Sequence, residues 1–464
     1  MTPPGYDVVI VGARCAGATL ATFLARAGAS VLLLDKDRLA SDQILSTHTI
    51  HPPGLDVLDD VGVGHAVRAV APPMHIVRLR KNDAIVDYGF LGGRAEYCPR
   101  RGRLDGLLQD AAASAGVEVL GGTRVTSLMR NGDRVVGVRA AGSREQEHEF
   151  RASLVVGADG RHSTVAQAVE AEEYLGYDAP RAMFWGYWNV PPFWQSDPAY
   201  RFGMYLANTG GHIRVIFQTD HDQLLIGSLP PVDEAMSWRT DADAALIADL
   251  ASDSTTGPLI AGSPPDGHVR GTVKERYFFR RAVGNGWALV GDAGHHKEFV
   301  IGDGITEALL QARSLAAAIA QGTEPALHRW WRARDVEALP YFFLGRDEGR
   351  VGPPMALHQI VFAHAAKTPS LQARLAATME HQLSPQETFP VQHVLWCMLG
   401  ALFRGSLRVM PEFMTMARRG AADSREVRLR QRLLKEADAL IPEGADQAER
   451  GSGDGSPNRQ EQLK

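Results

Sequence analysis

Asp7-Val8-Val9-Ile10-Val11-Gly12-Ala13-Arg14-Cys15-Ala16-Gly17 is the stretch of this 464-residue chain that decides its fold. The apolar residues up to Val11 predict a short buried strand, and helix formers with apolar residues at helical spacing continue from Ala16 to Ala27. A second apolar strand is predicted at Val31 to Leu34. Strand, helix and strand within about thirty residues predict a βαβ unit, with the helix beginning at the carboxyl edge of the first strand.

The loop of this unit predicts a nucleotide site. Gly12 to Gly17 stands where a G-x-G-x-x-G loop belongs, and Asp35, at the end of the second strand, would accept hydrogen bonds from ribose hydroxyls. A pyrophosphate would lie on the helix N-terminus, where N–H groups and the dipole favour anions. Arg14 replaces the middle glycine, so its Cβ must point away from the phosphates, over which its guanidinium could fold back. Alone, the loop also fits a turn of another α/β fold. The candidate residues here are Gly12, Ala13, Arg14, Cys15, Ala16, Gly17, Asp35 and Lys36.

Two later motifs narrow the prediction. Val155 to Ser163 reads VVGADGRHS, a buried strand that ends in an Asp-Gly pair. Leu289 to His296 reads LVGDAGHH, and Gly302-Asp303-Gly304-Ile305 follows it. In this order, the three stretches resemble the aromatic-hydroxylase-like flavoprotein monooxygenases, the single-component class with one FAD domain. The resemblance covers roughly residues 6–335.

The resemblance implies roles for residues on the flavin side. Asp292 would bind the FAD ribitol. The N–H groups at Gly302, Gly304 and Ile305 would face the flavin pyrimidine edge, where a positive helix end stabilises negative charge on reduced flavin. The resemblance therefore predicts that the flavin lies at the start of this helix.

Further roles follow from the same resemblance at the nucleotide end. Asp159 would help to hold FAD and the nicotinamide cofactor. Arg101 matches an arginine that many relatives aim at the FAD phosphates, and Val125 matches a residue whose backbone touches adenine. NADH or NADPH is the implied reductant.

The chain departs from the family pattern at three positions. Phe299 stands where relatives have a proline beside the oxygen-reacting face of the flavin, and Thr306 stands where many have asparagine. Ala166 replaces the arginine that usually closes the Asp-Gly motif. Oxygen insertion and nicotinamide handling are therefore less strongly implied than FAD binding.

Histidines supply the candidate acids and bases. His48 and His51 lie in the loop from Ser46 to Gly54, where either could deprotonate a phenol or amine because imidazole titrates near working pH. The alternative is a structural histidine bonded to backbone. His295 and His296 invite the same role, or would cover the flavin edge. The candidate catalytic residues are His48, His296 and Phe299.

The overall prediction is an α/β fold in which a Rossmann-like FAD-binding domain is interrupted by a mostly antiparallel β substrate domain and followed by a helical extension. The aromatic block from Met183 to Trp188 would pack the core of the substrate domain or line its pocket. The predicted division is 1–80, 97–175 and 285–335 for FAD binding, 81–96 and 176–284 for substrate, 336–442 for a helical extension broken by prolines, and 443–464 for a disordered tail.

Composition excludes several other classes. A net charge of −5 without a long Lys/Arg run makes nucleic acid an unexpected partner. Cys15, Cys98 and Cys397 lie far apart without a CxxC pair or a partner histidine at ligand spacing, so neither a disulfide framework nor a metal site is predicted. Nothing in the sequence predicts the oligomeric state.

The chain shows no targeting or membrane-spanning signal. Residues 1–6 run into the first strand without a basic segment or signal core, which predicts a cytoplasmic protein. The apolar run from Val394 to Phe403 has about half of the roughly 20 residues that a membrane span needs. A buried helix is the expected reading of this run, and a membrane-touching or partner-docking face is the alternative.

The resemblance implies an FAD-dependent monooxygenase that uses NAD(P)H and O2 to oxygenate a hydrophobic or aromatic small molecule. The cofactor would supply the redox chemistry, while the protein orients substrate and excludes water. The first alternative is a related reductase or dehydrogenase with a lipid-like or polycyclic substrate, which Phe299 would tolerate better. A non-catalytic flavin-binding partner protein is the second.

Overall fold

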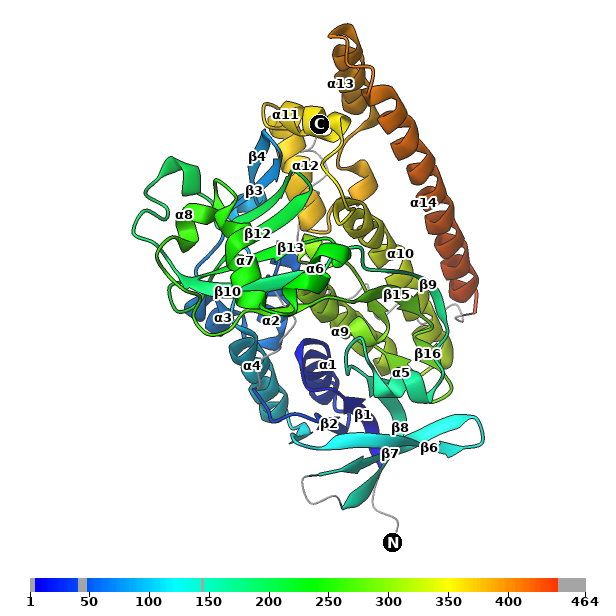
Figure 1. Cartoon of the computed structure of the whole chain (residues 1–464). Coiled ribbons are helices and arrows are strands. Elements are labelled where there is room, and N and C mark those ends of the chain that lie inside the picture. The colour runs from blue at the N-terminus through cyan, green and yellow to red at the C-terminus, as the bar shows by residue number, and fades with distance from the viewer. Residues whose placement is uncertain (1–4, 41–47, 143–145, 441–464) are drawn as a thin grey trace.

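The computed structural model describes residues 5–40, 48–142 and 146–440. Ser46 and Thr47 of the histidine loop and the predicted tail, 443–464, lie outside the described residues. The predicted fold class is confirmed: a largely parallel sheet with helices is interrupted by a second, mostly antiparallel sheet, and helices follow at the C-terminal end (Figure 1).

The first sheet is built from three separate parts of the chain. β1 pairs in parallel with β2 and with β8, so that Val8 lies opposite Val31 and Leu154. β17 extends the sheet, also in parallel, with Trp287 opposite Val155. The carboxyl ends of these strands therefore share one edge. The strand order is β16 (Val283–Gly284), β17 (Trp287–Leu289), β8 (Glu147–Gly157), β1 (Tyr6–Val11), β2 (Val31–Leu34) and β5 (Glu118–Leu120).

An antiparallel ribbon projects from this sheet. β6 (Arg124–Asn131) and β7 (Arg134–Ala141) form the predicted hairpin around Gly132, whose φ of 58° suits the turn. β7 then pairs with the first half of β8. Figure 1 shows the ribbon at the lower end of the molecule.

Helices pack on the parallel sheet. α1 (Cys15–Arg26) is the crossover helix between β1 and β2, and it packs against α4 (Arg101–Ser114) and α9 (Gly304–Ala320). α2 begins with two prolines, which suit a first turn, and ends at Gly62 with φ 91°. The shorter helices of this part are α2 (Pro52–Val61), α3 (Gly64–Val70) and α5 (Thr164–Ala168).

The second sheet has seven strands in the order β14-β10-β13-β12-β11-β3-β4. Every pairing in it is antiparallel except that of β11 with β3. β3 begins at Ile76, so the sheet includes residues 76–80, which the sequence-based division assigns to FAD binding. The strands are β3 (Ile76–Lys81), β4 (Ala84–Gly89), β10 (Met183–Asn189), β11 (Met204–Thr209), β12 (His212–Thr219), β13 (Gln223–Leu229) and β14 (Arg270–Thr272).

Smaller elements connect the two sheets. A three-stranded antiparallel sheet carries β18, with its paired histidines, beside β15. Its strands are β9 (Glu173–Asp178), β15 (Arg276–Arg280) and β18 (His295–His296). The remaining helices and helical turns before residue 304 are α6 (Val232–Trp238), α7 (Ala242–Ala251), α8 (Thr256–Ile260), η1 (Leu91–Gly93), η2 (Pro198–Tyr200), η3 (Gly291–Ala293) and η4 (Phe299–Ile301).

The C-terminal part is helical, as predicted. α10 (Glu324–Glu348) crosses the boundary placed at 335/336 and continues through Pro340, where a break is predicted. Leu339, Phe342 and Phe343 pack into an aromatic cluster there. The stability gained from this packing offsets the loss of the helix hydrogen bond that proline cannot make. α14 (Val409–Asp438) runs along α10 (Figure 1). The other elements are α11 (Ala356–Ala365), α12 (Pro369–Met379), η5 (Pro385–Glu387) and α13 (Val391–Phe403). None of the helices in the described ranges is long and apolar enough to cross a membrane.

Candidate functional site

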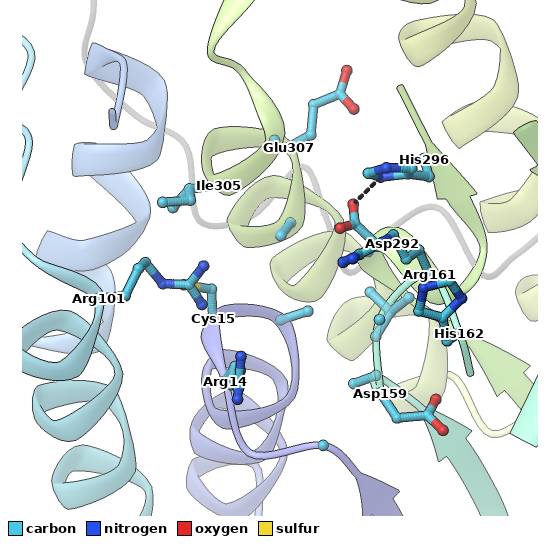
Figure 2. Close-up of a pocket in the computed structure, with 18 of the residues that line it drawn as sticks. Arg14, Cys15, Arg101, Asp159, Arg161, His162, Asp292, His296, Ile305 and Glu307 are labelled. Atoms are coloured by element: carbon cyan, nitrogen blue, oxygen red, sulfur yellow. Dashed lines mark ion pairs between the residues drawn. The ribbon is translucent and has the colours of Figure 1, made fainter. Parts of the chain in front are cut away.

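A cavity of about 760 Å³ lies at the carboxyl edge of the parallel sheet and brings the three predicted motifs together (Figure 2). Ala13 and Gly17 are the predicted site residues that do not line it. The predicted residues that do line it are Gly12, Arg14, Cys15, Ala16, Asp35, Lys36, His48, Arg101, Val125, Asp159, Asp292, His296, Phe299, Gly302, Gly304 and Ile305.

Close approach of three backbone segments explains the glycines of the first loop. Gly12 has φ 106°, and a Cβ there would lie 2.4 Å from the carbonyl oxygen of Ala158. A Cβ on Gly17 would lie 1.8 Å from the carbonyl oxygen of Gly12. Both positions therefore require glycine even without a ligand contact, because a side chain at either one would prevent α1 and the Asp-Gly loop from packing against β1.

Asp35 and Arg14 organise the nucleotide end of the cavity. The N–H groups of Ala13 and Asp37 donate to the two carboxylate oxygens of Asp35, at 2.7 and 2.9 Å. Ala13 therefore acts on the site through its backbone. The Arg14 guanidinium pairs with Asp37 at 2.9 Å, which places it beside the end of β2.

Arg101 supplies positive charge beside the N-terminus of α1. Its Nη2 lies 3.0 Å from both carboxylate oxygens of Asp105, which also accepts a hydrogen bond from the Cys15 thiol at 3.3 Å. The side chain is largely buried, yet its Nε has no hydrogen-bond partner among the described residues. Figure 2 shows the guanidinium next to Cys15, so an anionic group at the helix N-terminus would meet both.

The end of the cavity beside the start of α9 has room for a ligand. A Cβ on Gly304, in the first turn of α9, would meet no described atom within 4 Å. The Asp292 side chain is 46% exposed and lies 3.4 Å from Nδ1 of His296. The enclosing cavity wall desolvates the carboxyl of Asp292 and opposes its ionisation, although the side chain opens to the cavity, and His296 beside it holds the pKa of that carboxyl below its usual range. The cavity thus offers an anion site at the N-terminus of α1, a carboxylate acceptor at each of its ends, and open space at the start of α9. These features fit FAD.

We expect Asp292→Ala and Asp35→Ala each to weaken FAD binding about 10- to 150-fold, because each removes a charged acceptor worth about 1.5 to 3 kcal/mol. Equilibrium dialysis or flavin fluorescence would measure the change. Asp133→Ala, in the exposed turn between β6 and β7, is the matched control and should keep wild-type affinity. If both site variants hold stoichiometric FAD at low free cofactor, the assignment is wrong.

His48 is joined to the second sheet at the cavity wall. Its Nε2 lies 2.5 Å from the hydroxyl of Tyr187 on β10, and the two rings stack. Burial is the main cause that holds the pKa of His48 well below its usual range, and the guanidinium groups of Arg101, Arg270 and Arg100 lower it further. Arg100 also lies over the Tyr187 ring, 4.1 Å from its centroid. This imidazole is therefore neutral near pH 7.

His51 fits the structural alternative. Its Nδ1 pairs with Glu96 at 2.8 Å, and its Nε2 donates to the carbonyl oxygen of Ile301 at 3.2 Å. Burial opposes the charged form, but Glu96 outweighs it and raises the pKa of His51. The backbone N–H of His51 donates to the hydroxyl of Thr306, at 3.0 Å. Thr306, one of the departures from the family pattern, thus fastens the histidine loop to α9.

A buried ionic network lies on the flavin side of the cavity. Lys297 Nζ lies 2.6 Å from Asp303 Oδ2 and 2.5 Å from Glu307 Oε1. His295 pairs with the other oxygen of Glu307 at 2.7 Å, and His381, in the turn after α12, pairs with Asp303 at 3.1 Å. Burial opposes the charged forms of Asp303, Glu307 and Lys297, but the attraction between their opposite charges outweighs it. The pKa values of Asp303 and Glu307 are therefore lowered, and that of Lys297 is raised. The network fixes the start of α9.

His296 and Phe299 face an aromatic corner. Phe299 meets Tyr277 edge to face at 5.6 Å between ring centroids and His296 at 5.8 Å. Glu298 stands between His296 and Phe299 in the sequence. Its carboxylate accepts hydrogen bonds from the Tyr277 hydroxyl and from the Phe299 N–H. Burial raises the pKa of Glu298 to about 7.

Sequence reasoning missed Asp303, Glu307 and Glu298 as site residues. Asp303 could have been predicted, because it is an acidic residue inside the Gly302-Asp303-Gly304 motif and Lys297 precedes it by six residues. His381 gives no sequence signal, because it reaches the site from the turn after α12, beyond the family motifs.

The sequence profile of a family described as FAD binding domain matches residues 5–326. A 6-methylpretetramide 4-monooxygenase of Streptomyces rimosus is 34% identical over 166 residues, covering 34% of this chain and 39% of that protein. A digeranylgeranylglycerophospholipid reductase of Methanococcoides burtonii is 26% identical over 337 residues, covering 68% and 74%. A probable electron transfer flavoprotein-quinone oxidoreductase of Escherichia coli is 27% identical over 175 residues, covering 36% and 40%. The matched region thus spans about two fifths of the monooxygenase and of the Escherichia coli protein.

Solved structures share the fold. The flavin-dependent brominase Bmp2 superposes with a TM-score of 0.70 at 18% identity, covering 87% of this chain and 100% of that one. PqsL of Pseudomonas aeruginosa, a probable FAD-dependent monooxygenase, superposes with a TM-score of 0.61 at 19% identity, covering 83% and 100%. At such identities the likeness concerns the fold alone.

Proposed function

Because the chain belongs to the FAD-binding-domain family of flavoprotein monooxygenases, we propose that it uses NADH or NADPH and O2 to oxygenate a hydrophobic or aromatic small molecule. The observation that carries the proposal is the His48–Tyr187 pair within reach of three arginines at the cavity wall. This pair lies where the FAD-binding part meets the second sheet, which we assign to the substrate.

The charges around this pair favour a substrate that loses a proton. Positive groups that lower the pKa of His48 would also lower that of a phenol or enol bound beside it. The neutral imidazole would act as the base through the Tyr187 hydroxyl, which would pass its own proton to Nε2 and take up the proton of the substrate. An ionised ring is more electron-rich and therefore reacts more readily with an electrophilic oxygen donor.

FAD, when bound, would take a hydride from NAD(P)H and activate O2 for transfer of one oxygen atom to the substrate. Asp35, Arg101 and Asp292 would hold it, and the first turn of α9 would favour negative charge on its pyrimidine edge. Phe299 and Tyr277 would exclude water from the reacting face.

The proposal is tested by oxygen uptake with NADH or NADPH, with and without a panel of phenols and polycyclic phenols. We expect substrate-stimulated uptake, one product oxygen atom from labelled O2, and loss of stimulation in His48→Asn. Phe299→Ala should shift the balance from product to hydrogen peroxide, since water gains access. Product formation without O2, or none of the label in product, would overturn the proposal.

A reductase acting on a lipid-like or polycyclic substrate is the second candidate. It is favoured by the similarity to the phospholipid reductase over 68% of the chain and by Phe299 in place of the family proline. Anaerobic assays distinguish the two functions. Without O2, a reductase would still consume reductant and saturate its substrate, whereas a monooxygenase would form no product.

A further inference from the structure

α13 and the turn after it expose a row of large apolar side chains. Val391, Leu395, Leu399 and Phe403 follow one another at four-residue spacing, so they lie on one side of the helix. The α13 patch consists of these four with Trp396 and Leu407. Trp396 is 63% exposed, Leu407 76% and Phe403 91%. An apolar surface of this length is uncommon on a protein without a partner.

The other side of α13 is packed, so the helix is firmly seated. Cys397, Met398 and Ala401 are buried against Leu357 and Val361 of α11. The prediction of a buried helix is therefore correct for one face only and wrong for the other. Figure 1 shows α13 at the end of the molecule farthest from the β6–β7 ribbon. A flat partner could reach the patch there without touching the cavity.

Charges beside the patch are positive. Arg404 and Arg408, in the turn between α13 and α14, are exposed. Glu412 is the only carboxylate between residues 391 and 419, and it accepts hydrogen bonds from the N–H groups of Ala356 and Leu357 at the start of α11. Within residues 391–419 the exposed charged side chains are therefore arginines, while Glu387, before the start of α13, is an exposed acid at the opposite end of the helix.

We propose that the α13 patch binds the surface of an anionic lipid bilayer, with the helix lying in the plane of the interface. An apolar helix face bordered by arginines has the two features that such binding needs: area to bury among acyl chains and attraction to acidic headgroups.

The test is co-sedimentation of the full FAD-loaded chain with vesicles of phosphatidylcholine alone or with 30% phosphatidylglycerol. We expect binding to the anionic vesicles that weakens with salt. The double variant Trp396→Ser/Phe403→Ser should bind at least about tenfold more weakly, given the apolar area lost. Replacing Arg404 and Arg408 by glutamine should cost about fivefold each on anionic vesicles and little on neutral ones.

Met236→Ser, at an exposed apolar residue on α6, is the matched control and should bind as the wild type does. Retained FAD content shows that each variant is folded. Wild-type protein that stays in the supernatant with anionic vesicles at low salt would overturn the proposal. So would a concentration-dependent dimer, seen by sedimentation velocity, that Trp396→Ser/Phe403→Ser dissociates while vesicle binding is unchanged.

Discussion

Lys297→Met is expected to lower the free energy of unfolding by about 3 to 5 kcal/mol, because it leaves two buried carboxylates without their shared cation. Lys297 is 4% exposed, and Asp303 and Glu307 are equally enclosed. Their charges persist in the folded protein only because Lys297 and the two histidines offset the cost of burial.

Urea denaturation followed by circular dichroism would measure this change. Lys274→Met, at an exposed lysine, is the control and should stay within about 0.5 kcal/mol of the wild type. The double variant Lys297→Met/Glu307→Gln should recover part of the loss, since it removes one of the unpaired charges. A single variant as stable as the wild type would show that the ions are solvated rather than paired.

Glu298→Gln is expected to become more stable than the wild type by up to about 3 kcal/mol as pH rises from 4.5 to 8. Burial raises the pKa of Glu298 to about 7 in the folded protein. Between about 4.5 and 7, the unfolded chain has released this proton and the folded chain has not, so wild-type stability falls with pH across that window. Above it, the folded protein holds a buried charge, and Arg181, the cation that lowers the pKa of Glu298, donates its hydrogen bonds to backbone carbonyls instead.

The measurement is the difference in unfolding free energy between variant and wild type at half-unit pH steps, because other titrating groups cancel in that difference. Glu436→Gln, at an exposed glutamate on α14, should follow the wild type throughout. A difference that is flat from pH 4.5 to 8 would show that Glu298 ionises as it would in water.

Sequence patterns predicted the parts of the site that local geometry dictates. The loop from Gly12 to Gly17 and Asp35 follow from a strand, a turn and a helix that are adjacent in sequence, while the role of the Gly-rich start of α9 was predicted from the family resemblance. Parallel strands then carry these ends to one edge, which is why motifs from three distant stretches line one cavity.

Partners that arrive from elsewhere in the chain could not be predicted in this way. The hydrogen bond of His48 to Tyr187 depends on where the second sheet docks, and that of Asp303 to His381 depends on where the turn after α12 lies. β3 joined the second sheet by pairing in parallel with β11, a long-range contact that alternation within residues 76–81 does not specify. Patterns of burial also failed at α13, where an apolar run faces outward.

The pairing of β17 with β8 has a consequence for how the chain matures during synthesis. A ribosome that has released β1 to β8 has already exposed the pyrophosphate loop, but Asp292 and the start of α9 emerge only after the whole second sheet. Until then, Val155 to Gly157 form an unpaired apolar edge. During this interval the nascent protein is prone to aggregate and unable to bind its cofactor. The interval ends when β17, a strand of only three residues, pairs with β8.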